Sequence, residues 1–218
     1  MIETLTMQES LFKIEPFNLS AVGKVKNYKV SICERNTITD FIEEWHYSKN
    51  INGLSSMYCF KLQDEENNLI GAMIYGRIAM ANAWKKYATK EEDLMELKRL
   101  CCIDNTPKNT ESFFIGNTLR WLKKNTKVKR IISYADTTYS HEGTIYKASN
   151  FKYLGMTAKG KVVMYNGKRY HDRALRTKYN GRLKPFAKEL KEAVESGKAQ
   201  IVPTLGKHIY VYDLIHER

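Results

Sequence analysis

The chain has 218 residues, of which 43% are hydrophobic, and its formal net charge at pH 7 is +12. Such a composition fits one globular domain and excludes an intrinsically disordered chain. The longest apolar run, residues 69–79, is too short to cross a bilayer, so it predicts a buried strand and no membrane span. The N-terminal residues lack a basic and then apolar signal region, so we expect a cytoplasmic protein.

The positive charge is concentrated toward the C-terminus. Residues 156–218 hold 14 Lys and Arg against 6 Asp and Glu, which is +8 of the total +12. An excess of this size favours a polyanionic partner, nucleic acid above all. The alternative is a lysine-rich surface that is only solvated.

The four cysteines lie at positions 33, 59, 101 and 102 and form no C-x-x-C pair. Cys101 and Cys102 are adjacent, so on a strand they point to opposite faces and make poor ligands for one metal. We therefore expect reduced, structural thiols.

The first half of the chain predicts one amphipathic helix among strands. A T-x-x-D pattern at Thr37 and Asp40 predicts the N-terminal cap, and apolar residues at i, i+3, i+4 and i+7 continue the helix to about His46. Residues 80–94 are expected to be irregular. The predicted strands are residues 27–34, 56–62, 69–79 and 95–103.

In the second half, Asn109 or Thr110 opens a helix whose last turn is basic, as the helix dipole favours. The remaining predicted elements are strand 129–135, short helix 141–149, strand 151–155, helix 184–196 and strand 207–214. This order predicts an α/β fold with a mixed central sheet flanked by helices. We expect a lead-in (1–26), a core (27–158) and a basic C-terminal extension (159–218) that completes the same domain.

Two stretches resemble the GNAT acyltransferase superfamily. In GTIYKASNFKYLG, residues 143–155, Tyr146 lies on a short helix and Phe151 precedes a strand, with Asn150 where glycine is more usual. The strand 96–103 and helix 111–124 lie where GNAT enzymes bind acyl-CoA. The usual glycine-rich loop is replaced by PKNTES, residues 107–112.

Within that superfamily the chain resembles the Mom family of phage DNA-modification proteins. The motifs that carry the resemblance are HYSK at 46–49, ELKRL at 96–100, P-x-N-x-x-S at 107–112, RWLKK at 120–124, ISYAD at 132–136 and a closing GKHIYVYDL. The resemblance implies transfer of a methylcarbamoyl group to the exocyclic amine of adenine in duplex DNA, which protects phage DNA from restriction. It also implies acetyl-CoA or a related donor, and the host cytoplasm as the location.

The resemblance implies a CoA site formed by Arg99, Leu100, Asn109 and Ser112. Free N–H groups and the positive dipole at a helix N-terminus attract phosphate, and Arg99 would add a fixed charge. The alternatives are an N-cap role for Asn109 and a surface ion pair for Arg99.

The resemblance also implies the catalytic residues. The phenol of Tyr146 would protonate the departing thiolate, or else pack as an ordinary amphipathic tyrosine. Asp136 would hold or deprotonate the adenine amine, or else serve as a turn residue. His46 would be a base or metal ligand, or a structural residue at a helix end, and Tyr47 would stack on a flipped base.

Simple acetyl transfer does not explain a methylcarbamoyl product, so iron, another transition metal or a second substrate is a candidate. His46, Tyr47 and Asp136 are the possible ligands, although the sequence has no H-x-x-x-H or facial-triad spacing.

Residues 159–188, which we call the basic segment, predict contact with duplex DNA. Tyr165, Tyr170, His171 and Tyr179 lie among its cations, and aromatic rings stack on bases while cations bind phosphate. The predicted DNA-binding residues are Lys168, Arg169, Arg173, Arg176 and Lys178. Two other functions stay open: a GNAT N-acetyltransferase acting on protein, tRNA or a small amine, and a non-catalytic DNA-binding protein. A homodimer is also open.

Overall fold

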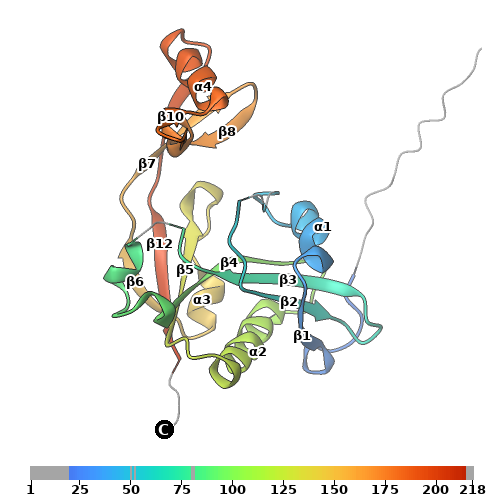
Figure 1. Ribbon diagram of the computed structural model, residues 1–218. Helices are drawn as coiled ribbons and strands as arrows, with labels where there is room; N and C mark the ends of the chain where they lie inside the picture. Colours follow the sequence, from blue (N-terminus) through green and yellow to red (C-terminus); the bar gives the residue numbers. More distant parts are fainter. Residues whose placement is uncertain (1–19, 50, 52, 80–81, 215–218) are drawn as a thin grey trace, which may run out of the picture.

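The body of the protein is a seven-stranded mixed sheet (Figure 1). The computed structural model describes residues 20–49, 51, 53–79 and 82–214, so most of the predicted lead-in lies outside the described residues. The strand order is β1 (Lys29–Cys33), β2 (Tyr58–Gln63), β3 (Leu69–Gly76), β4 (Leu94–Cys102), β5 (Arg130–Asp136), β12 (Lys207–Asp213) and β6 (Lys152–Met156). Only β4 and β5 pair in parallel; the other neighbours are antiparallel. The predicted α/β fold with a mixed central sheet flanked by helices is confirmed.

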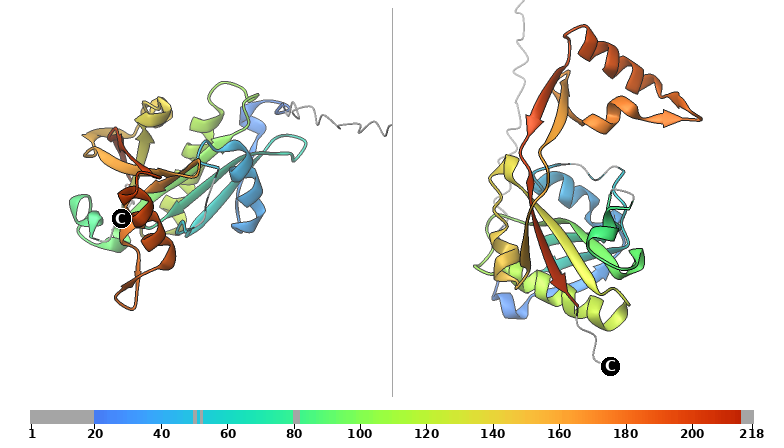
Figure 2. Two further views of the ribbon diagram at one scale, coloured as in Figure 1. Left: turned by 90° about the horizontal axis from the view of Figure 1, so that it is seen from above. Right: turned by 90° about the vertical axis from the view of Figure 1, so that its left-hand side faces the viewer.

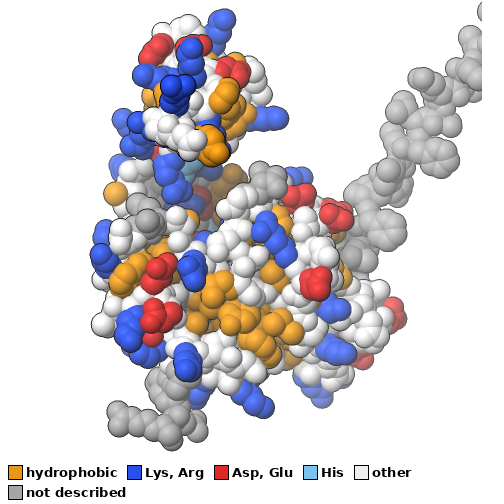
Figure 3. Space-filling model, viewed as in Figure 1, with side chains coloured by type: hydrophobic (Ala, Val, Ile, Leu, Met, Phe, Trp, Pro, Cys, Tyr) orange, Lys and Arg blue, Asp and Glu red, His pale blue; other side chains and the backbone are white. Residues whose placement is uncertain are grey.

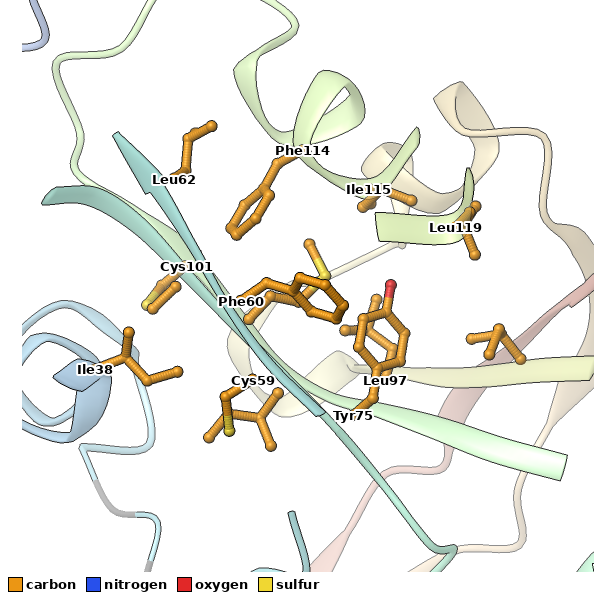
Figure 4. Packing of buried hydrophobic residues seen from close by; sticks show 14 of the residues in the cluster. Ile38, Cys59, Phe60, Leu62, Tyr75, Leu97, Cys101, Phe114, Ile115 and Leu119 are labelled. Atoms are coloured by element: carbon orange, nitrogen blue, oxygen red, sulfur yellow. The ribbon is translucent and has the colours of Figure 1, made fainter. Parts of the chain in front are cut away.

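Helices cover both faces of this sheet. Figure 4 shows Phe114, Ile115 and Leu119 of α2 on one side of the strands and Ile38 of α1 on the other. The body's helices are α1 (Asn36–Trp45), α2 (Thr110–Asn125) and α3 (Thr144–Ala148), with 3-10 turns η1 (Val25–Asn27), η2 (Ala83–Lys86), η3 (Glu91–Asp93) and η4 (Thr137–Tyr139). The apolar spacing of α1 and α2 therefore predicted their buried faces correctly.

The start of α1 differs from the prediction. The helix begins at Asn36, with Arg35 as N-cap and no side-chain capping bond, so Thr37 lies inside the first turn. The guanidinium of Arg35 instead donates hydrogen bonds to the carbonyls of Ile51 and Leu54. Bonds to a distant loop thus take the place of the predicted local cap, and the predicted end near His46 is confirmed.

The core lies between the sheet and its helices. The apolar run at 69–79 forms β3, whose residues from Ile70 to Gly76 are all buried, as predicted. The hydroxyl of Tyr75 is paired with Thr118 Oγ1 at 2.8 Å, so this large buried side chain leaves no polar atom unsatisfied. Among the described residues, no helix is both long and apolar enough to cross a membrane.

All four cysteines are free thiols, as predicted. Burial raises the pKa of Cys33 to about 11 and that of Cys101 to about 12, so both stay protonated at neutral pH. A protonated, buried thiol packs as a small apolar group.

Residues 160–204 form an arm that projects from the body (Figures 1 and 2). Its elements are β7 (Gly160–Tyr165), β8 (Lys168–His171), η5 (Asp172–Arg176), β9 (Lys178–Tyr179), β10 (Arg182–Leu183), α4 (Pro185–Glu195) and β11 (Gln200–Thr204). Strands β11, β7 and β8 form an antiparallel sheet, and α4 packs on it around Val163, Leu190, Ala193 and Ala199. The arm therefore has a small core of its own.

The arm is an insertion in the sheet of the body. After β11 the chain returns as β12, which pairs with β5 on one side and β6 on the other. The strands of the arm were not predicted; β8, β9 and β10 are short and rich in Lys and Arg, so they show no apolar alternation. Two Asn-Gly pairs, Asn166–Gly167 and Asn180–Gly181, are the local signal that marks its hairpins, and all four residues have positive φ.

Candidate active site

The site begins where β4 and β5 separate. Their parallel pairing extends only from Leu94–Arg130 to Leu97–Ser133, although both strands continue beyond that point. The Ser133 hydroxyl donates to the Leu97 carbonyl at 3.1 Å, at the last paired position. Beyond it the two strands turn unpaired edges toward each other, and a ligand can enter between them.

A cluster of aromatic rings lies beside this gap. The ring of Tyr47 is 4.2 Å from that of His46, 4.4 Å from that of Tyr139 and 4.9 Å from that of His141, measured between centroids. Tyr47 and Tyr139 are each 39% exposed, so both rings present a face to solvent. The loop after α1 and the loop after β5 thus form one aromatic surface.

The Tyr47 hydroxyl is in an environment of mixed charge. Burial and the neighbouring Asp136 carboxylate raise the pKa of Tyr47, while the cations Arg99 and Arg169 oppose the rise. Three predicted site residues, Tyr47, Arg99 and Asp136, therefore lie within electrostatic reach of one another. Arg169 belongs to the arm, so the arm also reaches the site.

His46 is buried and uncharged. Burial, followed by the nearby charges of Arg99 and His141, lowers the pKa of His46 to about 3. Its Nδ1 accepts a hydrogen bond from the Ser48 backbone N–H at 3.1 Å. In a neutral ring this assigns the proton to Nε2, so the ring offers a hydrogen-bond donor rather than a basic lone pair.

Asp136 ends β5 and is only 3% exposed. Its Oδ2 lies 2.8 Å from Lys207 Nζ, and its Oδ1 accepts from the Thr138 backbone N–H at 3.1 Å. Burial favours the neutral acid, but the bonds from Lys207 and Thr138 outweigh it and lower the pKa of Asp136. The carboxylate is therefore ionised and fixed. Lys207 was missed by sequence reasoning, because the pair forms only when β12 lies beside β5.

Tyr146 lies on α3 with its ring 5.4 Å from Tyr210 and 5.5 Å from Phe151. Burial raises the pKa of Tyr146 to about 12, and a hydrogen bond with Ser133 opposes the rise. Its phenol stays protonated at neutral pH and lies at the point where β4 and β5 separate. This is the position that a proton donor to that gap requires.

A groove of about 880 Å³ runs along α2 toward the end of α3. Asn109 and Ser112, which the resemblance implied as cofactor contacts, line it, and Asn109 is the N-cap of α2 with a positive φ of 72°. Sequence reasoning missed four basic residues of this wall: Lys26, Lys108, Arg120 and Lys123. Its acid, Asp213, is paired with Arg130 at 2.6 Å, so the groove favours an anion.

Arg99 and Leu100 lie apart from Asn109 and Ser112. Arg99 is close to Tyr47 and Glu96, and Leu100 packs against the main core. The register between β3 and β4 shifts where Ile74 pairs with Arg99 and Tyr75 with Leu97. Such a bulge alters the alternation of side chains along a strand, and the sequence carries no signal for it here.

The predicted DNA-binding residues lie on the arm, and Figure 3 shows Lys and Arg side chains gathered there. Asp172 is paired with Arg176 at 2.7 Å, so this carboxylate is offset by one of the cations. The exposed cations are Lys168 and Arg169 on β8, Arg173 and Arg176 on η5, and Lys178 on β9.

The candidate metal ligands His46, Tyr47 and Asp136 lie close together, because the rings of His46 and Tyr47 are 4.2 Å apart and the Asp136 carboxylate is within electrostatic reach of Tyr47. Asp136 is paired with Lys207, and His46 accepts a hydrogen bond at Nδ1. Over the described ranges, no group of three or more His, Cys, Asp or Glu side chains is arranged to hold a metal.

The fold and the site define an α/β protein with a mixed sheet that opens between its two parallel strands. Residues 27–218 match the Mom protein family, and the chain belongs to that family. It is 25% identical over 173 residues to the methylcarbamoylase mom of Escherichia phage Mu, with 76% of this chain and 70% of that protein covered.

Among solved structures, an acetyltransferase from Bacillus subtilis in complex with CoA aligns with a TM-score of 0.49 and 12% identity, covering 86% of this chain and 99% of that chain. The ribosomal-protein-S5-alanine acetyltransferase of Vibrio fischeri aligns with a TM-score of 0.48 and 11% identity, covering 90% and 97%.

Replacing Lys207 by Met should destabilise the protein in a pH-dependent way. The lowered pKa of Asp136 means that the pair stabilises the fold above the ordinary carboxyl pKa of 3.8 and ceases to do so as pH falls through the lowered value. The Tm difference between wild type and Lys207→Met should be largest near neutral pH and shrink below about pH 4. Lys152→Met is the control, because Lys152 is 77% exposed and 4.0 Å from Asp213. A Tm difference that does not change with pH would show that the pair does not set the ionisation of Asp136.

Proposed function

We propose that this protein is a transferase that adds a methylcarbamoyl group to N6 of adenine in duplex DNA, with acetyl-CoA or a related thioester as donor. Family membership supports the proposal, because the phage Mu relative is named a methylcarbamoylase. In a phage this modification would protect the DNA from restriction.

The observation that carries the proposal is that two surfaces lie at the gap between β4 and β5: the aromatic surface around Tyr47 and the basic arm. The solvent-facing ring of Tyr47 lies next to the ionised Asp136, and Arg169 of the basic arm is close enough to influence Tyr47. A base inside a duplex is out of reach of such a site until it leaves the stack. A cationic arm that holds the backbone beside an aromatic surface suits that task.

The residues then have separable roles toward the base. Tyr47 stacks on the extruded adenine, and the fixed carboxylate of Asp136 accepts a hydrogen bond from the N6 amine. Because Lys207 lowers the pKa of Asp136, this carboxylate orients the amine and is a weak base. Tyr146 and the Nε2–H of His46 supply hydrogen bonds to groups that gain negative charge.

The thioester occupies the groove along α2. Its phosphates lie near the start of that helix, where Lys108 and Ser112 line the wall, with Arg120 and Lys123 farther along. The acyl end then extends toward the gap between β4 and β5. Simple acetyl transfer to N6 would give an N-acetyl group, so the residues described here account for binding and proton placement only.

Expression in a bacterial host should convert part of its deoxyadenosine to a modified nucleoside. Asp136→Asn should lower the modified fraction by roughly hundredfold or more, because it removes the charge that orients the amine. Mass spectrometry of nucleosides from digested plasmid DNA measures this fraction. Soluble wild-type protein that leaves only the four normal nucleosides would refute the reaction and favour an N-acetyltransferase or a non-catalytic DNA-binding protein.

Arg120→Ala should weaken CoA binding by roughly tenfold, because a charge-assisted hydrogen bond to phosphate contributes about 1.5–3 kcal/mol. Lys124→Ala is the matched control, since Lys124 lies on the same helix but is exposed and outside the groove lining. Arg99→Ala should also leave CoA affinity unchanged. Isothermal titration calorimetry measures the CoA affinity of each protein. If the wild type shows no heat of CoA binding, the groove is not the cofactor site.

Replacing Lys168, Arg169, Arg173 and Arg176 together by Ala should weaken duplex binding for all sequences. Each lost phosphate contact reduces the slope of log affinity against log salt by about 0.9, so the slope should fall by about three to four units. CoA binding should not change. Fluorescence anisotropy at several salt concentrations tests this, and a wild-type slope in the quadruple variant would mean that these four residues are only a solvated face.

A further inference from the structure

The strands β9 and β10 form a hairpin at the end of η5. Tyr179 pairs with Arg182 and Lys178 with Leu183, so Asn180 and Gly181 form a two-residue turn. Their φ angles of 47° and 77° are those of a type I′ turn, which matches the twist of the strands. The Lys184 N–H donates to the Thr177 carbonyl at 2.9 Å and closes the base of the hairpin.

One face of this hairpin is fixed to the arm. Leu183 lines a groove of about 570 Å³ together with Leu175 and Val194, and its cross-strand partner Lys178 lines the same groove. Side chains alternate along strands, so Tyr179 and Arg182 share the opposite, outward face. Tyr179 is 70% exposed, which is more than any other large hydrophobic side chain of the described residues.

The sequence around this tyrosine is rich in positive charge. Residues 173–184 contain five basic residues and no acid: Arg173, Arg176, Lys178, Arg182 and Lys184. Figure 2 (right) shows the hairpin extending away from β7 and β11, which form the stem of the arm. A rigid ribbon with a solvent-facing aromatic ring and flanking cations is complementary to a polyanion whose bases are accessible.

We propose that this hairpin enters the major groove of the duplex, with Tyr179 against the base edges and Arg182 on the phosphates. The major groove of B-DNA admits a two-stranded ribbon, and apolar contact with base edges there, such as thymine methyl groups, adds affinity that does not depend on salt. This inference rests on the proposed function, because it assumes that duplex DNA is the partner. It adds a contact made by neither the gap between β4 and β5 nor the predicted basic residues of β8 and η5.

The test separates the two kinds of contact by their salt dependence. Tyr179→Ala should weaken binding to a short labelled duplex by about fivefold or more with an unchanged salt slope, and Tyr179→Phe should bind like wild type. Arg182→Ala should lower the slope by about 0.9, whereas Lys198→Ala, an exposed lysine of the same arm beyond α4, should change it less. Thermal unfolding should be the same for all, because the altered side chains are exposed.

Wild-type protein that binds no duplex would overturn both this inference and the proposed function. If the wild type binds duplex and Tyr179→Ala binds equally well, the hairpin makes no base contact and the proposed function stands. A loss of affinity in Tyr179→Ala for single-stranded DNA but not for duplex would also overturn insertion into the groove.

Discussion

Parallel pairing between β4 and β5 ends after Leu97 and Ser133, and the candidate site depends on that separation. Strands that stayed paired would use their backbone groups on each other and leave no edge for a ligand. Because they part, the chain places Tyr146 at the point of separation, while Tyr47 and Asp136 lie beside the open edges. The groove along α2 is a separate feature, lined by residues of α2, of the end of α3 and of the end of β12.

The arm and the gap are coupled through adjacent residues rather than through a flexible linker. Lys207 begins β12 directly after the arm and forms the ion pair that fixes Asp136. Arg169 of β8 is near Tyr47 on the other side. A displacement of the arm would therefore change the surroundings of both the Asp136 carboxylate and the Tyr47 phenol.

Local patterns in the sequence predicted the body well, since α1, α2 and β3 each bury a face that follows from their apolar spacing. These patterns failed where contacts between residues far apart in the sequence determine how a side chain is placed. The pair of Lys207 with Asp136 needs β12 beside β5, and the direction of Arg99 needs the bulge against β3. The strands of the arm bury little and are rich in cations, so only their Asn-Gly turns marked them. The assignment of CoA came from resemblance, whereas that of DNA came from the charge and aromatic residues of the arm together with the resemblance.

The insertion of the arm has a consequence for how the sheet assembles. β6 has a single strand neighbour in the body, β12, which follows only after the whole arm. During synthesis β6 therefore has no strand to pair with in the body until the chain has been made as far as Asp213. Loop closure across the arm is slow compared with local pairing. The arm has its own core and pairs β7 with β11, so it brings its two ends together before β12 pairs with β6. This lowers the entropy cost of closing the loop between β6 and β12.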